Sequence, residues 1–139
     1  ITVDNVTKLI DKKVYKVAQV MEADHISFKT QQFLHKEFIS KEGKTLILCD
    51  GGDKPAIFNA YSALLKEGDY IGVHDFFKTQ EDFNNQKAWS WLECTEDQIK
   101  NVIKEYKLEE TDTYMLNIVW GIYKKTIEKV AIPSFSSYI

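Results

Sequence analysis

The stretch LILCDGGDKPAIFNAYSALLKEGDYIGVHDFF, from Leu46 to Phe77, decides the fold that this sequence predicts. It opens within an apolar run, Thr45–Cys49, whose continuity is typical of a strand covered on both faces in a parallel sheet. A helix over Ala56–Lys66 follows, with Asp53 as a suitable N-cap. A second apolar strand, Tyr70–Val73, comes next. This strand–helix–strand unit predicts two neighbouring parallel strands.

Apolar patterning extends the same architecture in both directions along the chain. Alternating or continuous apolar residues predict three more strands, at Val14–Val20, Trp89–Cys94 and Tyr114–Tyr123. Helical spacing predicts two more helices, Ile26–Lys41 after an N-cap at Ser27 and Ile99–Tyr106 after a capping box at Thr95. Residues Phe76–Lys87 are expected to form a loop with one helical turn. The sequence therefore predicts an α/β fold with a mostly parallel sheet and flanking helices.

Composition sets limits on the class of protein. The 139 residues are 44% apolar and 28% charged, which excludes a disordered or collagen-like chain and suits one globular domain. No apolar run approaches the roughly 20 residues of a membrane helix, so no membrane partner is expected. The net charge of -3 argues against nucleic acid as the main partner. Every basic residue is Lys, so an anion site must use lysines, main-chain N–H groups or a metal.

Two cysteines and the absence of a secretion signal indicate the compartment. Cys49 and Cys94 each end an apolar run, where a reduced cysteine behaves as a small hydrophobe. Two cysteines in a chain of this length are not a disulfide framework. With no signal-peptide pattern at the start of the sequence, we expect a cytoplasmic protein.

The two strands of the central unit both end in acidic residues, Asp50 and Asp75. If these strands are parallel neighbours, about 4.8 Å apart, both carboxylates lie at one edge of the sheet and could share a Mg²⁺ ion. Such an ion would polarise a substrate hydroxyl. His74 and Asp53 could assist, although alternation along a strand would turn His74 away from Asp75. The alternative is that both aspartates only cap turns.

Other residues near these strand ends also have two interpretations. Lys54 could approach an acidic substrate, or act as a base if burial favoured its neutral form; the alternative is a solvated lysine. Gly51 and Gly52 could allow a ligand close to the backbone, or could serve only a tight turn. The aromatic segment Phe76–Phe83 could close over the site and exclude water.

The stretch Leu46–Phe77 resembles the second half of a Rossmann-like S-adenosylmethionine-dependent methyltransferase, most closely the cephalosporin-hydroxylase-like and macrocin O-methyltransferase-like group. The shared pattern is an apolar strand ending in Asp, a small polar turn, a helix, a Gly-Asp turn, and a strand ending in acidic residues or His-Asp. A looser resemblance extends over Val14–Lys125 through WSWLECTEDQIKNVIKEYKL and YMLNIVWGIYKK. It implies a partial Rossmann-like methyltransferase domain at 1–125, with an antiparallel C-terminal strand in its mostly parallel sheet, and a tail at 126–139.

The resemblance assigns expected roles to the residues at the strand ends. In metal-using members of the group, acids at these positions bind Mg²⁺ beside the methyl-accepting oxygens, which implies Asp50 and Asp75 as metal ligands. It also implies catalytic roles for Asp50, Lys54 and His74, since Lys54 lies near where some methyltransferases place a base. The second strand ends in His-Asp, where relatives often have two acids.

The sequence departs from the family at its start. The Gly-rich turn of type E/D-x-G-x-G that binds the cofactor does not occur in this sequence. The resemblance implies that Asp4 would hold the ribose, with Asp24 near the adenine and Gly51 beside the cofactor. We expect one or two βα units, about 60 residues, to be missing before Ile1. The alternative is a degenerate relative that has lost cofactor binding.

Three functional hypotheses follow. The first is a methyltransferase that moves the methyl group of S-adenosylmethionine to an oxygen of a small-molecule acceptor, with Mg²⁺ assistance. The second is a noncatalytic methyltransferase-like module that serves in a homo-oligomer or a larger assembly. The third is another α/β enzyme that modifies sugars or nucleotides, because a fold does not fix a function.

Overall fold

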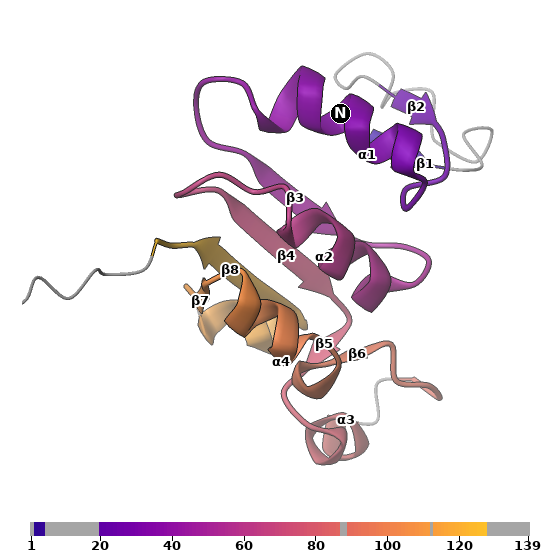
Figure 1. The fold of residues 1–139 in the computed structure, drawn as a ribbon. Coiled ribbons are helices and arrows are strands. Elements are labelled where there is room, and N and C mark those ends of the chain that lie inside the picture. Colours follow the sequence, from indigo (N-terminus) through magenta and orange to yellow (C-terminus); the bar gives the residue numbers. More distant parts are fainter. Residues whose placement is uncertain (1, 5–19, 87–88, 112, 128–139) are drawn as a thin grey trace, which may run out of the picture.

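The computed structural model describes residues 2–4, 20–86, 89–111 and 113–127 (Figure 1). Its main sheet has four strands in the order β3 (Leu46–Cys49), β4 (Tyr70–His74), β8 (Trp120–Lys125) and β7 (Leu108–Glu110). Strands β3 and β4 are parallel, and β8 is antiparallel to both of its neighbours. The protein is therefore a mixed α/β structure, and the predicted antiparallel C-terminal strand is confirmed.

Two smaller strand pairs lie beside the main sheet. Strand β1 (Thr2–Asp4) pairs in parallel with β2 (Val20–Glu22), and β5 (Phe76–Phe77) pairs in parallel with β6 (Cys94–Thr95). The strand predicted at Val14–Val20 lies outside the described residues except for Val20, which begins β2.

The helices begin where the sequence provides caps. The Ser27 hydroxyl accepts a hydrogen bond from Thr30 at the start of α1 (Phe28–Leu34), which continues as the π-helix η3 (His35–Ile39). The Asp53 carboxylate caps α2 (Lys54–Ser62), and the Thr95 N–H donates to the Gln98 side chain at the start of α4 (Glu96–Glu105). These cap predictions are confirmed. In the described part of the chain, the helices are too short or too polar to cross a bilayer.

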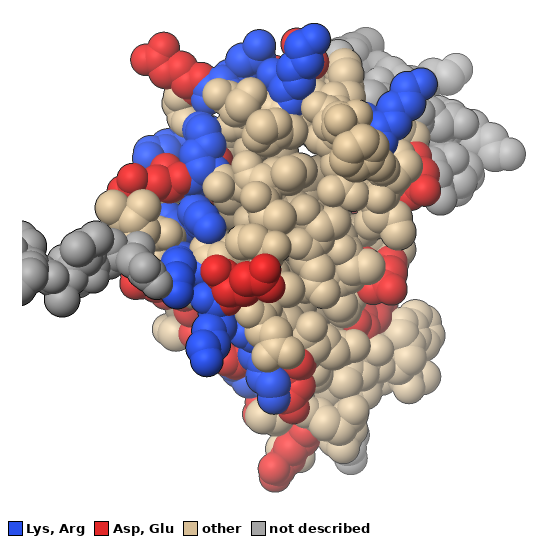
Figure 2. Space-filling view, in the orientation of Figure 1, with Lys and Arg blue, Asp and Glu red and all other residues tan. Residues whose placement is uncertain are grey.

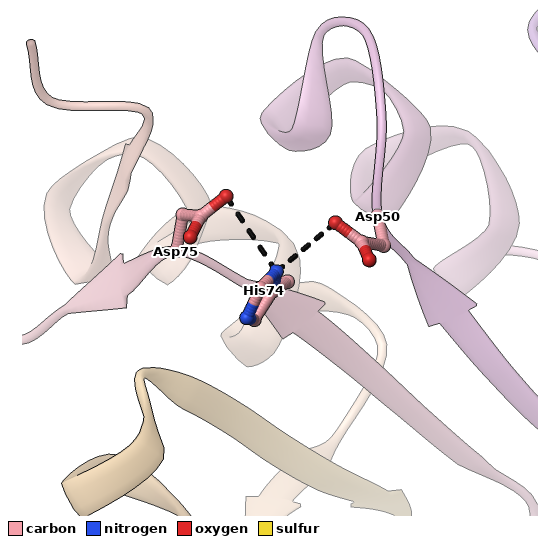
Figure 3. A group of neighbouring side chains, drawn as sticks. All are labelled: Asp50, His74 and Asp75. Carbon is pink, nitrogen blue, oxygen red and sulfur yellow. Dashed lines mark hydrogen bonds and ion pairs between the residues drawn. The ribbon is translucent and has the colours of Figure 1, made fainter.

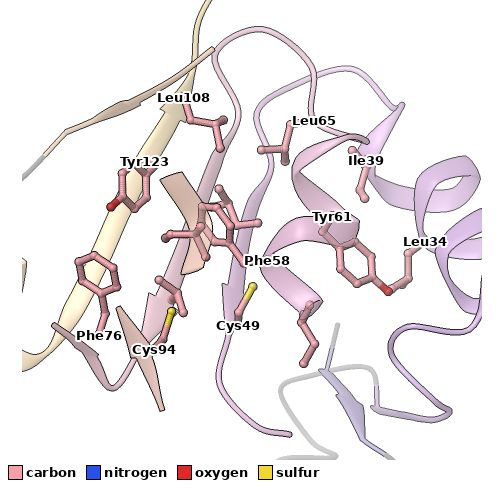
Figure 4. Close-up of a cluster of buried hydrophobic side chains, with 14 residues drawn as sticks. Leu34, Ile39, Cys49, Phe58, Tyr61, Leu65, Phe76, Cys94, Leu108 and Tyr123 are labelled. Carbon is pink, nitrogen blue, oxygen red and sulfur yellow. The ribbon is translucent and has the colours of Figure 1, made fainter. Parts of the chain in front are cut away.

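The core lies between the sheet and helices α2 and α4 (Figure 4). Phe58 of α2 is fully buried at its centre, and its ring meets Tyr123 of β8 edge-to-face with 5.6 Å between centroids. The β3 and β4 side chains on this face, among them Cys49, Ile71 and Val73, are buried as well. Burial of large apolar side chains on one face is what fixes the sheet against its helices.

The opposite face of β3 corrects one prediction. Leu46 and Leu48 are 58% and 55% exposed, so β3 is not covered on both faces by the described residues. Successive side chains of a strand point to opposite faces, and α2 covers only the face that carries Cys49. A continuous apolar run was therefore an unreliable sign of two-sided burial.

The region after β4 differs most from the sequence prediction. Residues Thr113–Ile118 form the 3-10 helix η4, and the strand begins only at Trp120, because Val119 adopts a left-handed φ of 57° that breaks an extended chain. Of Trp89–Cys94, only Cys94 is in a strand. The segment predicted as a loop with one turn contains β5 and the helix α3 (Gln80–Gln86).

A buried aspartate aligns the starts of β3 and β4. Asp69 is fully buried, and its carboxylate accepts hydrogen bonds from the main-chain N–H groups of Thr45 (2.8 Å) and Lys66 (2.9 Å) and from the Lys66 ammonium (3.0 Å). The Tyr70 N–H then donates to the Thr45 carbonyl at 2.8 Å. One side chain thus joins the turn before β4 to Thr45, the residue directly before β3.

Replacement of Asp69 by Ala is expected to lower the free energy of unfolding by about 3 kcal/mol, because it leaves main-chain donors and a lysine without their acceptor. Urea unfolding followed by circular dichroism measures this. The control is Asp97→Ala, whose side chain is 85% exposed and should change stability by less than about 0.5 kcal/mol. Equal effects of the two substitutions would contradict the role given to Asp69.

The two cysteines are expected to resist thiol reagents while the protein is folded. Burial raises the pKa of both the Cys49 and the Cys94 thiol to about 12, and the thiolate is the reactive form. A chromogenic disulfide reagent at mildly alkaline pH should label neither thiol in native protein and both in guanidinium chloride. Rapid labelling of the native protein would show that this core is open.

Candidate functional site

The parallel register of β3 and β4 brings chemically active side chains to one edge of the sheet. Cys49 pairs with Val73, so the next residues, Asp50 and His74, leave the sheet side by side. Figure 3 shows Asp50 and Asp75 pointing toward His74 from either side. His74 Nδ1 lies 3.0 Å from Asp50 Oδ1 and 3.6 Å from Asp75 Oδ2. These three residues are defined here as the Asp50–His74–Asp75 cluster.

The backbone of Asp75 explains why two consecutive residues face the same place. Asp75 has a φ of 52°, in the left-handed region that residues other than glycine seldom adopt. This turn ends the alternation of β4, so the Asp75 carboxylate returns toward His74. The expectation that His74 faces away from Asp75 is therefore wrong. Such a conformation costs on the order of 1 kcal/mol, and the surrounding contacts must hold it.

The cluster runs from solvent to interior. The Asp50 side chain is 55% exposed, whereas Asp75 is 19% exposed. The His74 ring stacks on Trp120 of β8, with centroids 4.5 Å apart and planes at 27°. One carboxylate is thus open to an incoming molecule, and the other is shielded and held in place.

Lys54 is buried beneath the cluster. It is 4% exposed at the first residue of α2, and its ammonium donates to Asp75 Oδ2 at 2.6 Å. It also pairs with Glu93. The solvated-lysine interpretation is therefore wrong. An ammonium that donates to two carboxylates is placed to orient them, and this geometry does not favour a role as a base.

Glu93 belongs to the site and was not predicted from the sequence. Its carboxylate accepts a hydrogen bond from the indole N–H of Trp91 at 3.0 Å, in addition to the ion pair with Lys54. Lys54 and Glu93 are far apart along the chain, and no motif joins them. The only sequence signal was an acidic residue directly before a buried cysteine.

The remaining predicted residues lie in two places. Gly51 follows Asp50 with a φ of 143°, and a Cβ atom there would meet nothing within 4 Å, so this turn leaves open space beside the cluster. Asp24 accepts a hydrogen bond from the Ile26 N–H and caps its own turn. Asp4 ends β1 opposite Glu22. The structure therefore gathers Asp50, Gly51, Lys54, His74 and Asp75, and places Asp4 and Asp24 at the N-terminal strand pair and the turn after it.

The aromatic segment after β4 is part of the interior. Phe76, Phe77 and Phe83 are all buried, and the last two meet Trp89 edge-to-face. A Cβ atom added to Gly121 would lie 2.8 Å from the Phe76 ring, so the glycine leaves the space that this ring fills. The expectation that Phe76–Phe83 forms a movable cover is wrong for these three rings. Trp91, 63% exposed, is open to solvent beside Glu93, to which its indole N–H donates.

The donor atoms of the cluster suit a divalent cation. One ligand atom from each of Asp50, His74 and Asp75 lies within 4.8 Å of the other two. Carboxylate oxygens suit Mg²⁺ and Mn²⁺, and a neutral imidazole suits Zn²⁺ and Fe²⁺, so this mixed set is compatible with several divalent cations, Mn²⁺ among them. His74 Nδ1 would have to give up any proton that it shares with Asp50.

The cluster is an open edge, separate from the apolar cavity beside β3. That cavity holds about 170 Å³ and is lined by residues such as Leu34, Phe38, Leu48 and Ile57, but not by the cluster. It is smaller than the roughly 300 Å³ at which cofactor pockets begin. Figure 2 shows lysine and acidic side chains interleaved along one border of the face in view, an arrangement unlike the basic stripe of a nucleic-acid-binding surface.

Comparison of the sequence and structure with protein-family models, curated proteins and solved structures finds no match.

Proposed function

We propose that this protein is an S-adenosylmethionine-dependent methyltransferase that transfers a methyl group to the hydroxyl oxygen of a small molecule, with a divalent cation held by the Asp50–His74–Asp75 cluster. The observation that carries the proposal is the convergence of two carboxylates and an imidazole within 4.8 Å at the ends of adjacent parallel strands. Ligands of open α/β sheets bind outside the carboxyl ends of the strands. The sequence resemblance supplies the choice of methyl transfer.

The strand order is in keeping with that choice. Strands β3 and β4 with α2 between them form a parallel βαβ unit, and α4, β7 and β8 follow as a closing helix and strands. The antiparallel β8 lies between β4 and β7, and an antiparallel C-terminal strand is what the resemblance implies. A Rossmann-like fold is our proposal for the whole domain.

The side chains of the Asp50–His74–Asp75 cluster have different roles in binding the cation and the acceptor. A divalent cation, when bound, would polarise the acceptor hydroxyl. Asp50 is exposed and meets the acceptor as it enters, while Asp75 and His74 are held by Lys54 and by stacking on Trp120. Methyl transfer requires the acceptor oxygen in line with the departing sulfur, so rigid placement of these ligands is the main catalytic contribution of this edge.

The cation site is tested by Mn²⁺ binding, measured by isothermal titration calorimetry. The wild-type protein is expected to bind one Mn²⁺ per chain, and Asp50→Asn should weaken binding by about tenfold or more, because it removes a charged ligand. The matched control is Asp97→Asn, which removes an 85% exposed carboxylate paired with Lys100 and should leave affinity unchanged. Absence of saturable Mn²⁺ binding by the wild-type protein would overturn the cation site.

The cofactor is tested separately. The protein that contains this chain is expected to bind S-adenosylmethionine with micromolar affinity, and the demethylated product should compete. The reason is that the enzyme must hold the donor in line with the acceptor oxygen before the methyl group can move. A calorimetric titration with no heat, together with no competition by the demethylated product, would contradict the assignment to methyl transfer.

One observation favours the noncatalytic alternative. Leu46 and Leu48 are exposed at alternate positions of β3, and exposed apolar patches often mark contacts between proteins. If the chain is an assembly module, wild-type protein should associate in sedimentation experiments, and Leu46→Lys with Leu48→Lys should abolish association. Full methyl transfer by this double variant would separate the exposed face from the enzymatic function.

A further inference from the structure

We propose that Glu93 is a positioning residue that keeps Asp75 available as a cation ligand by sharing the charge of Lys54. This inference rests on the proposed function, since it concerns the cation site of that function. Glu93 does not belong to the Asp50–His74–Asp75 cluster and acts on it only through Lys54.

The geometry joins three separate parts of the chain. Lys54 comes from the first turn of α2, Asp75 follows the end of β4, and Glu93 lies directly before β6. The Lys54 ammonium is almost wholly buried and contacts both carboxylates. The second oxygen of Glu93 accepts the Trp91 indole N–H, so the Glu93 side chain is fixed at both oxygens.

The charges explain what Glu93 contributes. Asp75 uses the same oxygen, Oδ2, toward Lys54 and toward His74, so the ammonium competes with a cation for that oxygen. A buried lysine with one carboxylate would neutralise it, and little charge would be left to attract a metal. With Glu93 present, two carboxylates share one ammonium, and a net negative charge remains beside the cluster.

The left-handed backbone of Asp75 explains why Lys54 is paired with its carboxylate. Asp75 has a left-handed φ, and the charge-assisted hydrogen bond from Lys54 holds its carboxylate in place. An anchor that is also a cation would by itself weaken metal binding. Glu93 resolves this conflict, because it keeps the anchor while offsetting the charge.

Calorimetric Mn²⁺ titrations of folded variants test this role. Glu93→Gln is nearly isosteric and should weaken Mn²⁺ binding by about tenfold, because Lys54 then pairs with Asp75 alone. Glu93→Asp keeps the charge and should stay within about threefold of wild type. The double variant Lys54→Gln with Glu93→Gln removes the competing charge, keeps a hydrogen-bond donor at position 54, and should recover most of the affinity lost in Glu93→Gln. Asp97→Asn is the matched control: it removes an exposed carboxylate paired with Lys100 and should change nothing.

If the double variant recovers Mn²⁺ affinity, Glu93 acts by positioning Asp75. If Glu93 only stabilised the fold, the second substitution would lower the affinity further. Thermal unfolding of each variant establishes that it is folded. If Glu93→Gln does not fold, the Mn²⁺ affinities of Glu93→Asp and of the double variant are compared with that of the wild type instead. Wild-type affinity in Glu93→Gln, or a folded double variant no better than Glu93→Gln, would overturn this inference while leaving the cation site in place. A wild-type protein that binds no Mn²⁺ would overturn both.

Discussion

The carboxylate of Asp69 is the contact on which the site depends. Asp69 is buried and ties the Thr45 N–H at the start of β3 to the turn that opens β4. Because both strands leave this point in parallel and in fixed register, their far ends also coincide, and Asp50 emerges beside His74. An error of one residue in this register would move every side chain of a strand to the opposite face and separate the two.

Helix α2 connects the stability of the core with the arrangement of the site. Its middle buries Phe58 against the sheet, and its first residue, Lys54, reaches Asp75 at the end of β4. The N-cap Asp53 fixes where the helix starts, and therefore where the ammonium lies. The unfavourable backbone of Asp75 is thus stabilised by the same helix that closes the core.

The local parts of this structure could be predicted from the sequence. Short-range sequence patterns were sufficient to predict the strand–helix–strand unit and the helix caps at Ser27 and Asp53. The left-handed φ of Asp75 could not be predicted from the sequence, because Asp is common at the ends of strands whatever its backbone conformation. Glu93 could not be found because its partner Lys54 is brought to it only by the tertiary fold. The prediction of a loop after β4 was wrong because polar residues separate the phenylalanines along the sequence, although Phe77 and Phe83 pack together in the interior.

The most direct test of this account is a crystal structure of the protein grown with Mn²⁺, examined by anomalous scattering at the manganese edge. The account predicts one strong peak at coordination distance from Asp50, His74 and Asp75, with Lys54 still bridging Asp75 and Glu93. A map without a peak there, or with the two aspartate carboxylates turned apart, would contradict it.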